Sequence, residues 1–266
     1  LDHTLNKRLS ALFLIGAMTL ACTPSVQAQR DGAPEPPPED EQHPTSQPSL
    51  HEADSPSSPK DEHREEASSE TAWGEATFNQ GINPHILHRP DENRGVALFA
   101  GGCFWCMEAP FEELKGVTAV YSGYTGGQEP RPSYSQVSSY KTQHIEAVIV
   151  YYRPQEISYN ELLHTYWRSI NPTQRDGQFA DRGHQYTTGI FTVDKTQQGA
   201  ARASKESLTT SKKFRDPIAV KLYPAETFWP AEDYHQDYYK LHKSHYLRYK
   251  YGSGRAAYLK ETWGVE

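Results

Sequence analysis

The sequence has little cysteine, no excess of basic residues and no hydrophobic run of membrane-spanning length. Only three of its 266 residues are cysteine, and no second Cys-x-x-Cys motif or tightly spaced histidine pair lies near the single motif that contains Cys103. A structural zinc ion needs four ligands, so zinc is disfavoured there and no metal is expected. The formal net charge is −7. A nucleic-acid-binding protein would carry a basic face, so no nucleic-acid partner is expected.

The N-terminal segment has the pattern of an export signal. Lys7 and Arg8 precede an apolar stretch of 13 residues at positions 9–21. This stretch is too short to span a bilayer but has the length of a signal-peptide core. We therefore expect residues 1–28 to act as an export signal.

Two ways of processing this signal remain open. Residues 26–28 (VQA) form a small-x-small site, so cleavage can follow Ala28. Alternatively, the segment TLAC resembles the site at which bacterial lipoproteins are cut, here after Ala21, and lipidated on Cys22. The protein is then expected either in the periplasm or anchored to a membrane through a lipid on Cys22.

The acidic character of the chain is concentrated in residues 29–72. This segment holds twelve Asp and Glu residues against three Lys and Arg, together with eight prolines and no aromatic residue. Such a composition cannot bury enough apolar surface to offset the entropy of ordering. We expect a disordered, self-repelling linker, followed from about Trp73 by one nearly neutral domain, residues 73–266.

Strand-like and helix-like patterns alternate along this domain. The predicted strands are residues 96–100, 117–124, 144–152, 188–193 and 218–223. The predicted helices are residues 104–115, 158–170, 197–211 and 231–245, with Pro110 interrupting the first and Ser158 capping the second. The pattern predicts an α+β fold, a single two-layer domain with a mixed β-sheet flanked by helices.

The Cys-x-x-Cys motif follows a predicted strand and two glycines, in the segment GGCFWC. A helix that begins at Cys103 would place this thiol at the positive end of the helix dipole, where a lowered pKa is expected. Cys106 lies three residues further on, on the same helix face and within reach of a disulfide. A structural disulfide is the alternative, because exported proteins often contain disulfides. A loop this short would stabilise the fold only weakly, so a redox-catalytic pair is favoured.

Glu146 lies within the apolar segment HIEAVIVYY. Burial of its carboxyl would raise the pKa and keep the group protonated, able to donate a proton. A surface position on an edge strand is the alternative. Phe104 and Trp105, between the two cysteines, are equally compatible with ordinary core packing or with an apolar ligand pocket.

The segment GGCFWCMEAPFEELKGVTAVYSGYTGG closely resembles the active-site segment of the peptide-methionine sulfoxide reductase A family. The resemblance continues, in order, through PSYSQVSSYKTQHIEAVIVYY, INPTQRDGQFADRGHQYTTGIF, AEDYHQDYY and GRAAYLKETWG, and covers nearly all of residues 95–264. It implies reduction of the S epimer of methionine sulfoxide in proteins or peptides. Use of free methionine sulfoxide is left open.

The resemblance also implies roles for eight residues. Cys103 matches the nucleophile and Glu146 the catalytic acid. Phe104 and Trp105 match aromatic residues that hold the substrate methyl group. Tyr134 and Tyr186 match hydroxyls that contact the sulfoxide oxygen, and Asp181 matches an acidic residue of the same pocket. Many family members keep resolving cysteines near the C-terminus; residues 250–254 hold none here, which leaves Cys106 for that role.

The implied cycle runs through a sulfenic acid on Cys103 and a disulfide between Cys103 and Cys106. No bound cofactor is needed, because an external dithiol of the thioredoxin type would reduce that disulfide. The expected partners are oxidised proteins or peptides and this reductant, and the chain is expected to be a monomer.

Two other functions are compatible with parts of the sequence. A thioredoxin-like thiol-disulfide oxidoreductase would explain the Cys-x-x-Cys motif, but not Glu146 in an apolar strand. An exported, inactive binding module that keeps the pocket would consume no dithiol. In the predicted last helix, His242 and His245 have a spacing that a metal can use, although packing or solvated histidines are the favoured interpretation.

Overall fold

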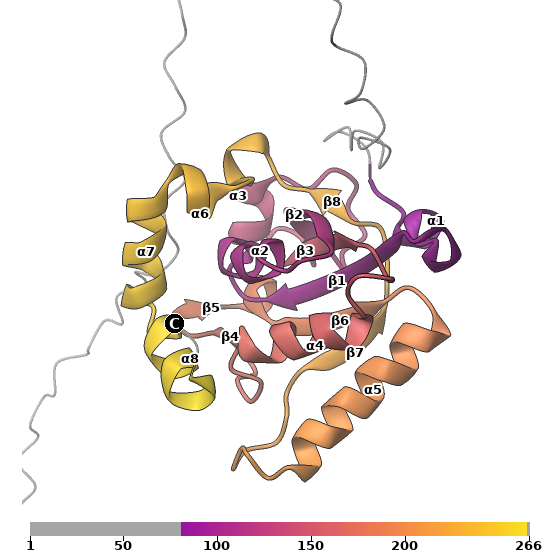
Figure 1. Cartoon of the computed structure of the whole chain (residues 1–266). Helices are drawn as coiled ribbons and strands as arrows, with labels where there is room; N and C mark the ends of the chain where they lie inside the picture. The colour runs from indigo at the N-terminus through magenta and orange to yellow at the C-terminus, as the bar shows by residue number, and fades with distance from the viewer. Residues whose placement is uncertain (1–80, 265–266) are drawn as a thin grey trace, which may run out of the picture. The chain divides into compact units, whose positions relative to one another are not determined.

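The computed structural model describes residues 81–264, so the expected signal, the expected linker and residues 73–80 lie outside the described part of the chain. A six-stranded sheet has the order β7-β6-β1-β3-β2-β8 (Figure 1). β6 and β7 run parallel, whereas the other neighbouring strands are antiparallel, so the sheet is mixed. Its strands are β1 (Gly95–Gly101), β2 (Val117–Thr125), β3 (Ile145–Tyr152), β6 (Thr188–Thr192), β7 (Lys221–Pro224) and β8 (Trp229–Pro230).

The two central strands, β1 and β3, are buried along their whole length. Both are apolar on their two faces because each face carries part of the core. Alternate residues divide between two apolar clusters: Phe99 and Val148 belong to one face, and Leu98 and Ile149 to the other. The predicted strands at 96–100, 117–124, 144–152 and 188–193 are confirmed, and the one at 218–223 begins three residues late.

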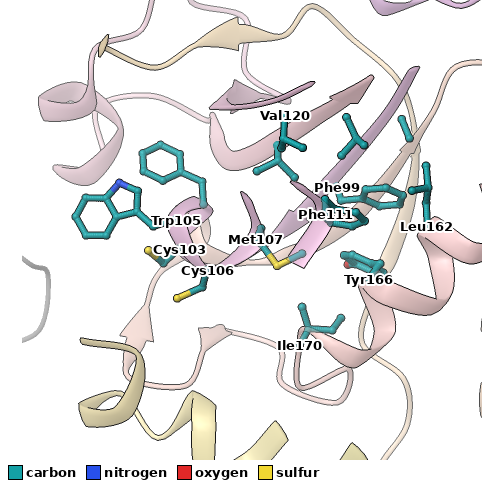
Figure 2. Close-up of a cluster of buried hydrophobic side chains, with 14 of the residues drawn as sticks. Phe99, Cys103, Trp105, Cys106, Met107, Phe111, Val120, Leu162, Tyr166 and Ile170 are labelled. Atoms are coloured by element: carbon teal, nitrogen blue, oxygen red, sulfur yellow. The ribbon is translucent and has the colours of Figure 1, made fainter. Parts of the chain in front are cut away.

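Three helices pack on the Phe99 face of the sheet, namely α2 (Phe104–Glu112), α4 (Tyr159–Arg168) and α5 (Lys195–Thr210). Phe99 stacks on Phe111 and on Tyr166 with ring centroids 5.0 and 5.1 Å apart, which joins β1 to α2 and α4 (Figure 2). The expected α+β class, with a mixed sheet flanked by helices, is confirmed.

Local sequence accounts for the start of α4. Ser158 accepts a hydrogen bond from the backbone N–H of Glu161, while the Glu161 side chain accepts one from the backbone of Ser158. This reciprocal capping box satisfies N–H groups that a helix start leaves unpaired. α2 continues through Pro110 but ends at Glu112, three residues before the predicted end.

The single helix predicted over residues 231–245 is wrong. The segment forms a 3₁₀ turn (Asp233–His235), α6 (Tyr238–Leu241) and α7 (Lys243–Gly252), and a further helix, α8 (Arg255–Trp263), follows. The break occurs because tertiary contacts take the local polar groups. The Gln236 side chain bonds both backbone groups of Ser122, and Asp237, at φ 53°, donates its N–H to Glu108.

Smaller elements complete the described part of the chain. They are α1 (Pro84–Leu87), α3 (Tyr134–Ser138), β4 (Gly177–Gln178), β5 (Asp181–Arg182) and the 3₁₀ turns Pro90–Glu92 and His184–Tyr186. β1 points toward the side where α7 and α8, in yellow, lie (Figure 1). Within residues 81–264, no helix is both long enough and apolar enough to cross a membrane.

Candidate active site

The end of β1 presents Cys103 as the residue that caps α2. Gly102 makes the turn with φ 81°, a conformation that L side chains rarely adopt. A Cβ atom at this position would also lie 2.6 Å from Cβ of Gln178 and 2.9 Å from a guanidinium nitrogen of Arg255. The two-glycine turn is therefore required by both backbone conformation and close packing.

Cys103 and Cys106 are free thiols, both buried, and their side chains lie next to each other (Figure 2). The expected lowering of the Cys103 pKa is wrong for this state. Burial raises the pKa of Cys103 well above its ordinary value, and Glu146 and Asp181 add to the effect. The dipole of one helix end is outweighed by desolvation. By contrast, a hydrogen bond from Cys103 and the charge of Arg255 lower the pKa of Cys106.

Glu146 projects from β3 into the same region and is buried. Its Oε2 accepts a hydrogen bond of 3.0 Å from the backbone N–H of Phe104, the residue after Cys103. Burial nevertheless raises the pKa of this carboxyl well above its ordinary value. The carboxyl is thus held protonated beside Cys103, and the alternative of a surface Glu is wrong.

Two phenolic hydroxyls share this environment. Tyr134 begins α3, Tyr186 lies in the 3₁₀ turn before β6, and both side chains are buried. Burial, and next the proximity of Glu146, raise the pKa of each phenol above its ordinary value. Both hydroxyls therefore stay protonated and can donate hydrogen bonds to an oxygen atom.

Asp181 reaches the site from β5, where Tyr249 of α7 donates a hydrogen bond to its Oδ2. The other oxygen, Oδ1, has no hydrogen-bond partner within residues 81–264. Burial raises the pKa of Asp181, opposed by the Tyr249 hydrogen bond. Sequence patterns did not single out Tyr249, because nothing in the tyrosine-rich segment 238–251 distinguishes it from its neighbours.

An aromatic wall continues from the cysteines. Trp105 stacks on Tyr238 with ring centroids 3.9 Å apart, and Phe104 packs at 4.9 Å from the ring of His235. His235 also packs at 4.5 Å from Tyr134, and burial lowers its pKa to about 3, so its ring is neutral. Phe104 and Trp105 are thus both core residues and walls of the site.

Seven of the eight expected residues line one cavity, and Tyr249 joins them. The lining residues are Cys103, Phe104, Trp105, Tyr134, Glu146, Asp181, Tyr186 and Tyr249. Cys106, the eighth, is one helical turn from Cys103 and outside this lining. The cavity volume is about 10 Å³, close to what a single water molecule requires. The site is therefore small.

The histidines considered for a metal are engaged in other contacts. Nδ1 of His245 lies 3.1 Å from the hydroxyl of Tyr238, and the ring of His242 packs against the same tyrosine. A separate cluster of carboxylates brings Glu108, Glu112 and Asp237 together. Lys240 forms ion pairs of 2.6 Å with Glu112 and with Asp237 of this cluster.

The chemistry of the cavity suits transfer of an oxygen atom from a polar S=O group to a thiol. A thiol lies beside a protonated carboxyl and two hydroxyl donors, and apolar rings exclude water. A second thiol within disulfide reach allows the first to be regenerated. These features define a thiol-dependent oxidoreductase.

Comparison with known proteins identifies the family. The model of the family described as peptide methionine sulfoxide reductase matches residues 95–266, and the chain belongs to this family. The enzyme MsrA of Bacillus subtilis is 47% identical over 175 residues, 66% of this chain and 99% of the relative. The Listeria monocytogenes (serotype 4a) MsrA is 46% identical over 172 residues, 65% of this chain and 97% of the relative.

A solved structure agrees with the fold. Mxr1 from Saccharomyces cerevisiae, in its reduced form, superposes with a TM-score of 0.54 at 27% identity, covering 57% of this chain and 87% of that one. The protein is accordingly a methionine sulfoxide reductase, and the thioredoxin-like alternative is not favoured.

Proposed function

We propose that the chain reduces the S epimer of methionine sulfoxide in oxidised proteins or peptides, with Cys103 as nucleophile and Glu146 as acid. The observation that carries this mechanism is the small cavity that a thiol, a protonated carboxyl and two phenolic hydroxyls line together. A bound sulfoxide would direct its oxygen to these donors and its methyl group to Phe104 and Trp105.

In the first step the Cys103 sulfur attacks the sulfoxide sulfur while Glu146 gives its proton to the sulfoxide oxygen. The oxygen moves to Cys103, the S=O bond breaks, and methionine leaves. The proton that Cys103 loses replaces the one that Glu146 gave. The substrate sulfur is reduced by two electrons, and Cys103 is oxidised to a sulfenic acid.

In the second step the Cys106 thiolate attacks the sulfur of the sulfenic acid. A disulfide forms, and the hydroxyl group leaves as water after taking up the proton of the Cys106 thiol. Cys106 is suited to this attack because its pKa is lowered by a hydrogen bond from Cys103 and by the charge of Arg255.

An external dithiol of the thioredoxin type then reduces the disulfide, so the cycle uses no bound cofactor. The dithiol supplies two electrons and two protons, and becomes a disulfide itself. We also propose that the chain acts as a monomer, since its own residues supply all eight positions of the site and no second copy is needed to complete it.

Stereochemistry provides a direct test of the proposed function. Peptides carrying a single S or R methionine sulfoxide would be incubated with the full chain and dithiothreitol, and methionine measured by chromatography. We expect turnover of the S epimer alone. Turnover of the R epimer, or of neither, would contradict the proposal.

We also propose that the chain is exported. The support is the basic pair Lys7 and Arg8, the apolar run at 9–21 and the acidic linker after it. The mass of the mature chain from a bacterial host separates the two forms of processing. A chain starting at Gln29 means signal cleavage, and a lipid-modified Cys22 in the membrane fraction means anchoring. An unprocessed chain in the cytosol would contradict export.

A further inference from the structure

Arg255, the first residue of α8, is a buried cation behind the two cysteines. Its Nη1 donates a hydrogen bond of 2.6 Å to the carbonyl oxygen of Ser169, and its Nη2 donates one of 2.8 Å to that of Gly101. The guanidinium carbon lies 4.5 Å from the centre of the Phe179 ring. The side chain is therefore held by backbone oxygens and by an aromatic face.

The guanidinium lies against the turn that carries the thiols. Nη2 contacts Gly101, which precedes the motif, and Nη1 lies 4.0 Å from Sδ of Met107, which follows it. A Cβ atom on Gly102 would lie 2.9 Å from Nη2. In Figure 2 the sulfur of Cys106 points toward the yellow C-terminal ribbon rather than toward Met107 and the core beyond it.

No carboxylate forms an ion pair with Arg255 among residues 81–264. A guanidinium keeps its proton at all accessible pH values, and a buried charge without a counter-charge is costly. The acidic groups that interact with it are Cys106, then Tyr249, Cys103 and Asp181. Of these four, Cys106 has the largest effect, so a thiolate there would give the cation a partner.

We propose that Arg255 is a positioning residue for the resolving step. Its fixed charge stabilises the Cys106 thiolate during attack on Cys103, and its hydrogen bond holds the Gly101 turn in place. This inference rests on the proposed function, because it assigns a role within the second step. No electrons or protons pass through Arg255, which acts only through Cys106.

Other groups also face Cys106 and contribute to the pH dependence of its ionisation. Cys103 donates a hydrogen bond to it from the same helix, and Asp181 opposes ionisation from β5. On α7, Lys250 favours the thiolate, while Tyr246 and Tyr249 interact with the same sulfur. Arg255 is distinguished from Lys250 by its complete burial, which removes solvent screening.

The test compares three variants of the full chain. Arg255→Gln removes the charge but keeps an amide donor, and Arg255→Lys keeps the charge. Arg248→Gln is the control, at an exposed arginine on α7. Reduced protein would be mixed with one equivalent of S-sulfoxide peptide and no reductant. Methionine release and loss of the dimedone-reactive sulfenic acid would be followed at several pH values.

In Arg255→Gln we expect disulfide closure near neutral pH to slow by about tenfold more than methionine release, with its pH profile moved upward by about one unit. Arg255→Lys should recover most of the rate. Equal closure rates and profiles in Arg255→Gln and Arg248→Gln would overturn the inference. Absence of methionine from the parent would instead contradict the proposed function.

A second measurement needs neither sulfoxide turnover nor a substituted Arg255. In Cys103→Ser, where serine keeps a hydroxyl donor, the thiolate of Cys106 can be titrated by its ultraviolet absorbance. The inference predicts a pKa below that of an ordinary cysteine. A value at or above the ordinary one would overturn it, even if Arg255→Gln does not fold.

Discussion

The backbone N–H of Phe104 donates a hydrogen bond of 3.0 Å to Oε2 of Glu146, which ties the first turn of α2 to the carboxyl on β3. The residue after Cys103, the proposed nucleophile, thus fixes the position of the Glu146 carboxyl, the proposed acid. Because one oxygen of the carboxyl accepts this bond, the protonated oxygen remains free to donate. Cys103 and Glu146 both line the same small cavity.

Replacement of Glu146 tests the role of this carboxyl. In the proposed mechanism the protonated form of Glu146 is the active one, so the parent should lose activity as pH rises through the raised pKa of Glu146. Glu146→Gln should lower kcat/KM by about 10²- to 10⁴-fold and lose this alkaline limb, because an amide does not titrate. Steady-state kinetics against pH measures both. If Glu146→Gln shows the same loss of kcat/KM at high pH as the parent, a group other than Glu146 causes that loss.

The hydroxyls of Tyr134 and Tyr186 are expected to act on one oxygen atom. Tyr134→Phe and Tyr186→Phe should each lower kcat by about 10- to 1000-fold with a small change in KM, because donors to a developing charge act mainly in the transition state. The double variant should lose less than the product of the two effects. Tyr140→Phe, at an exposed tyrosine, is the control. Equal activity of all three single variants would exclude the role.

Glu108 should make stability depend on pH. This buried carboxyl accepts hydrogen bonds from the Asp237 backbone and from Ser122, and burial raises its pKa from 4.5 to about 8. Below pH 4.5 both the folded and the unfolded chain hold the proton. Between 4.5 and about 8 only the folded chain does, so this contribution is lost as pH rises through the folded pKa.

Glu108→Gln should remove this dependence. At about 1.4 kcal/mol per pKa unit, the parent should lose several kcal/mol of unfolding free energy between weakly acidic and alkaline pH, relative to Glu108→Gln. Urea unfolding at several pH values measures the difference, and Glu226→Gln, at an exposed position, is the control. Parallel pH dependence in the parent and Glu108→Gln would contradict the assignment.

Gly102→Ala should destabilise the fold by at least about 1 kcal/mol, because a side chain is strained at φ 81° and meets Gln178 and Arg255. Gly199→Ala is the matched control, since Gly199 lies within α5 and nothing lies within 4 Å of its added Cβ. Gly199→Ala should raise the free energy of unfolding by about 0.5–1 kcal/mol. Thermal or urea unfolding measures the stability of both variants. A Gly102→Ala chain as stable as the parent would contradict the requirement for glycine at position 102.

The central strands and the motif were predictable because their signals are local. β1 and β3 are apolar runs, the glycines mark the turn, and Ser158 with Glu161 marks a helix start. The apolar neighbours of Glu146 left both a buried and a surface position open, and the family resemblance favoured the buried one. The other pocket residues, including Tyr134, Asp181 and Tyr186, were predictable only through family resemblance.

What sequence patterns missed depends on tertiary contacts. The break at residues 236–237 follows from bonds to Ser122 and Glu108, which local propensity does not contain. Tyr249 and Arg255 enter the site only because α7 and α8 fold back against the turn at Gly101. The pKa of Cys103 was mispredicted because its burial in the folded chain outweighs the helix dipole, and local sequence does not show that burial.

The most direct test of the account is the methionine yield of Cys103→Ser and Cys106→Ser with an S-sulfoxide peptide, with and without thioredoxin. We predict no methionine from Cys103→Ser, one methionine per chain from Cys106→Ser without further turnover by thioredoxin, and continuous turnover by the parent. Methionine from Cys103→Ser, or thioredoxin-driven turnover by Cys106→Ser, would contradict the two-cysteine mechanism.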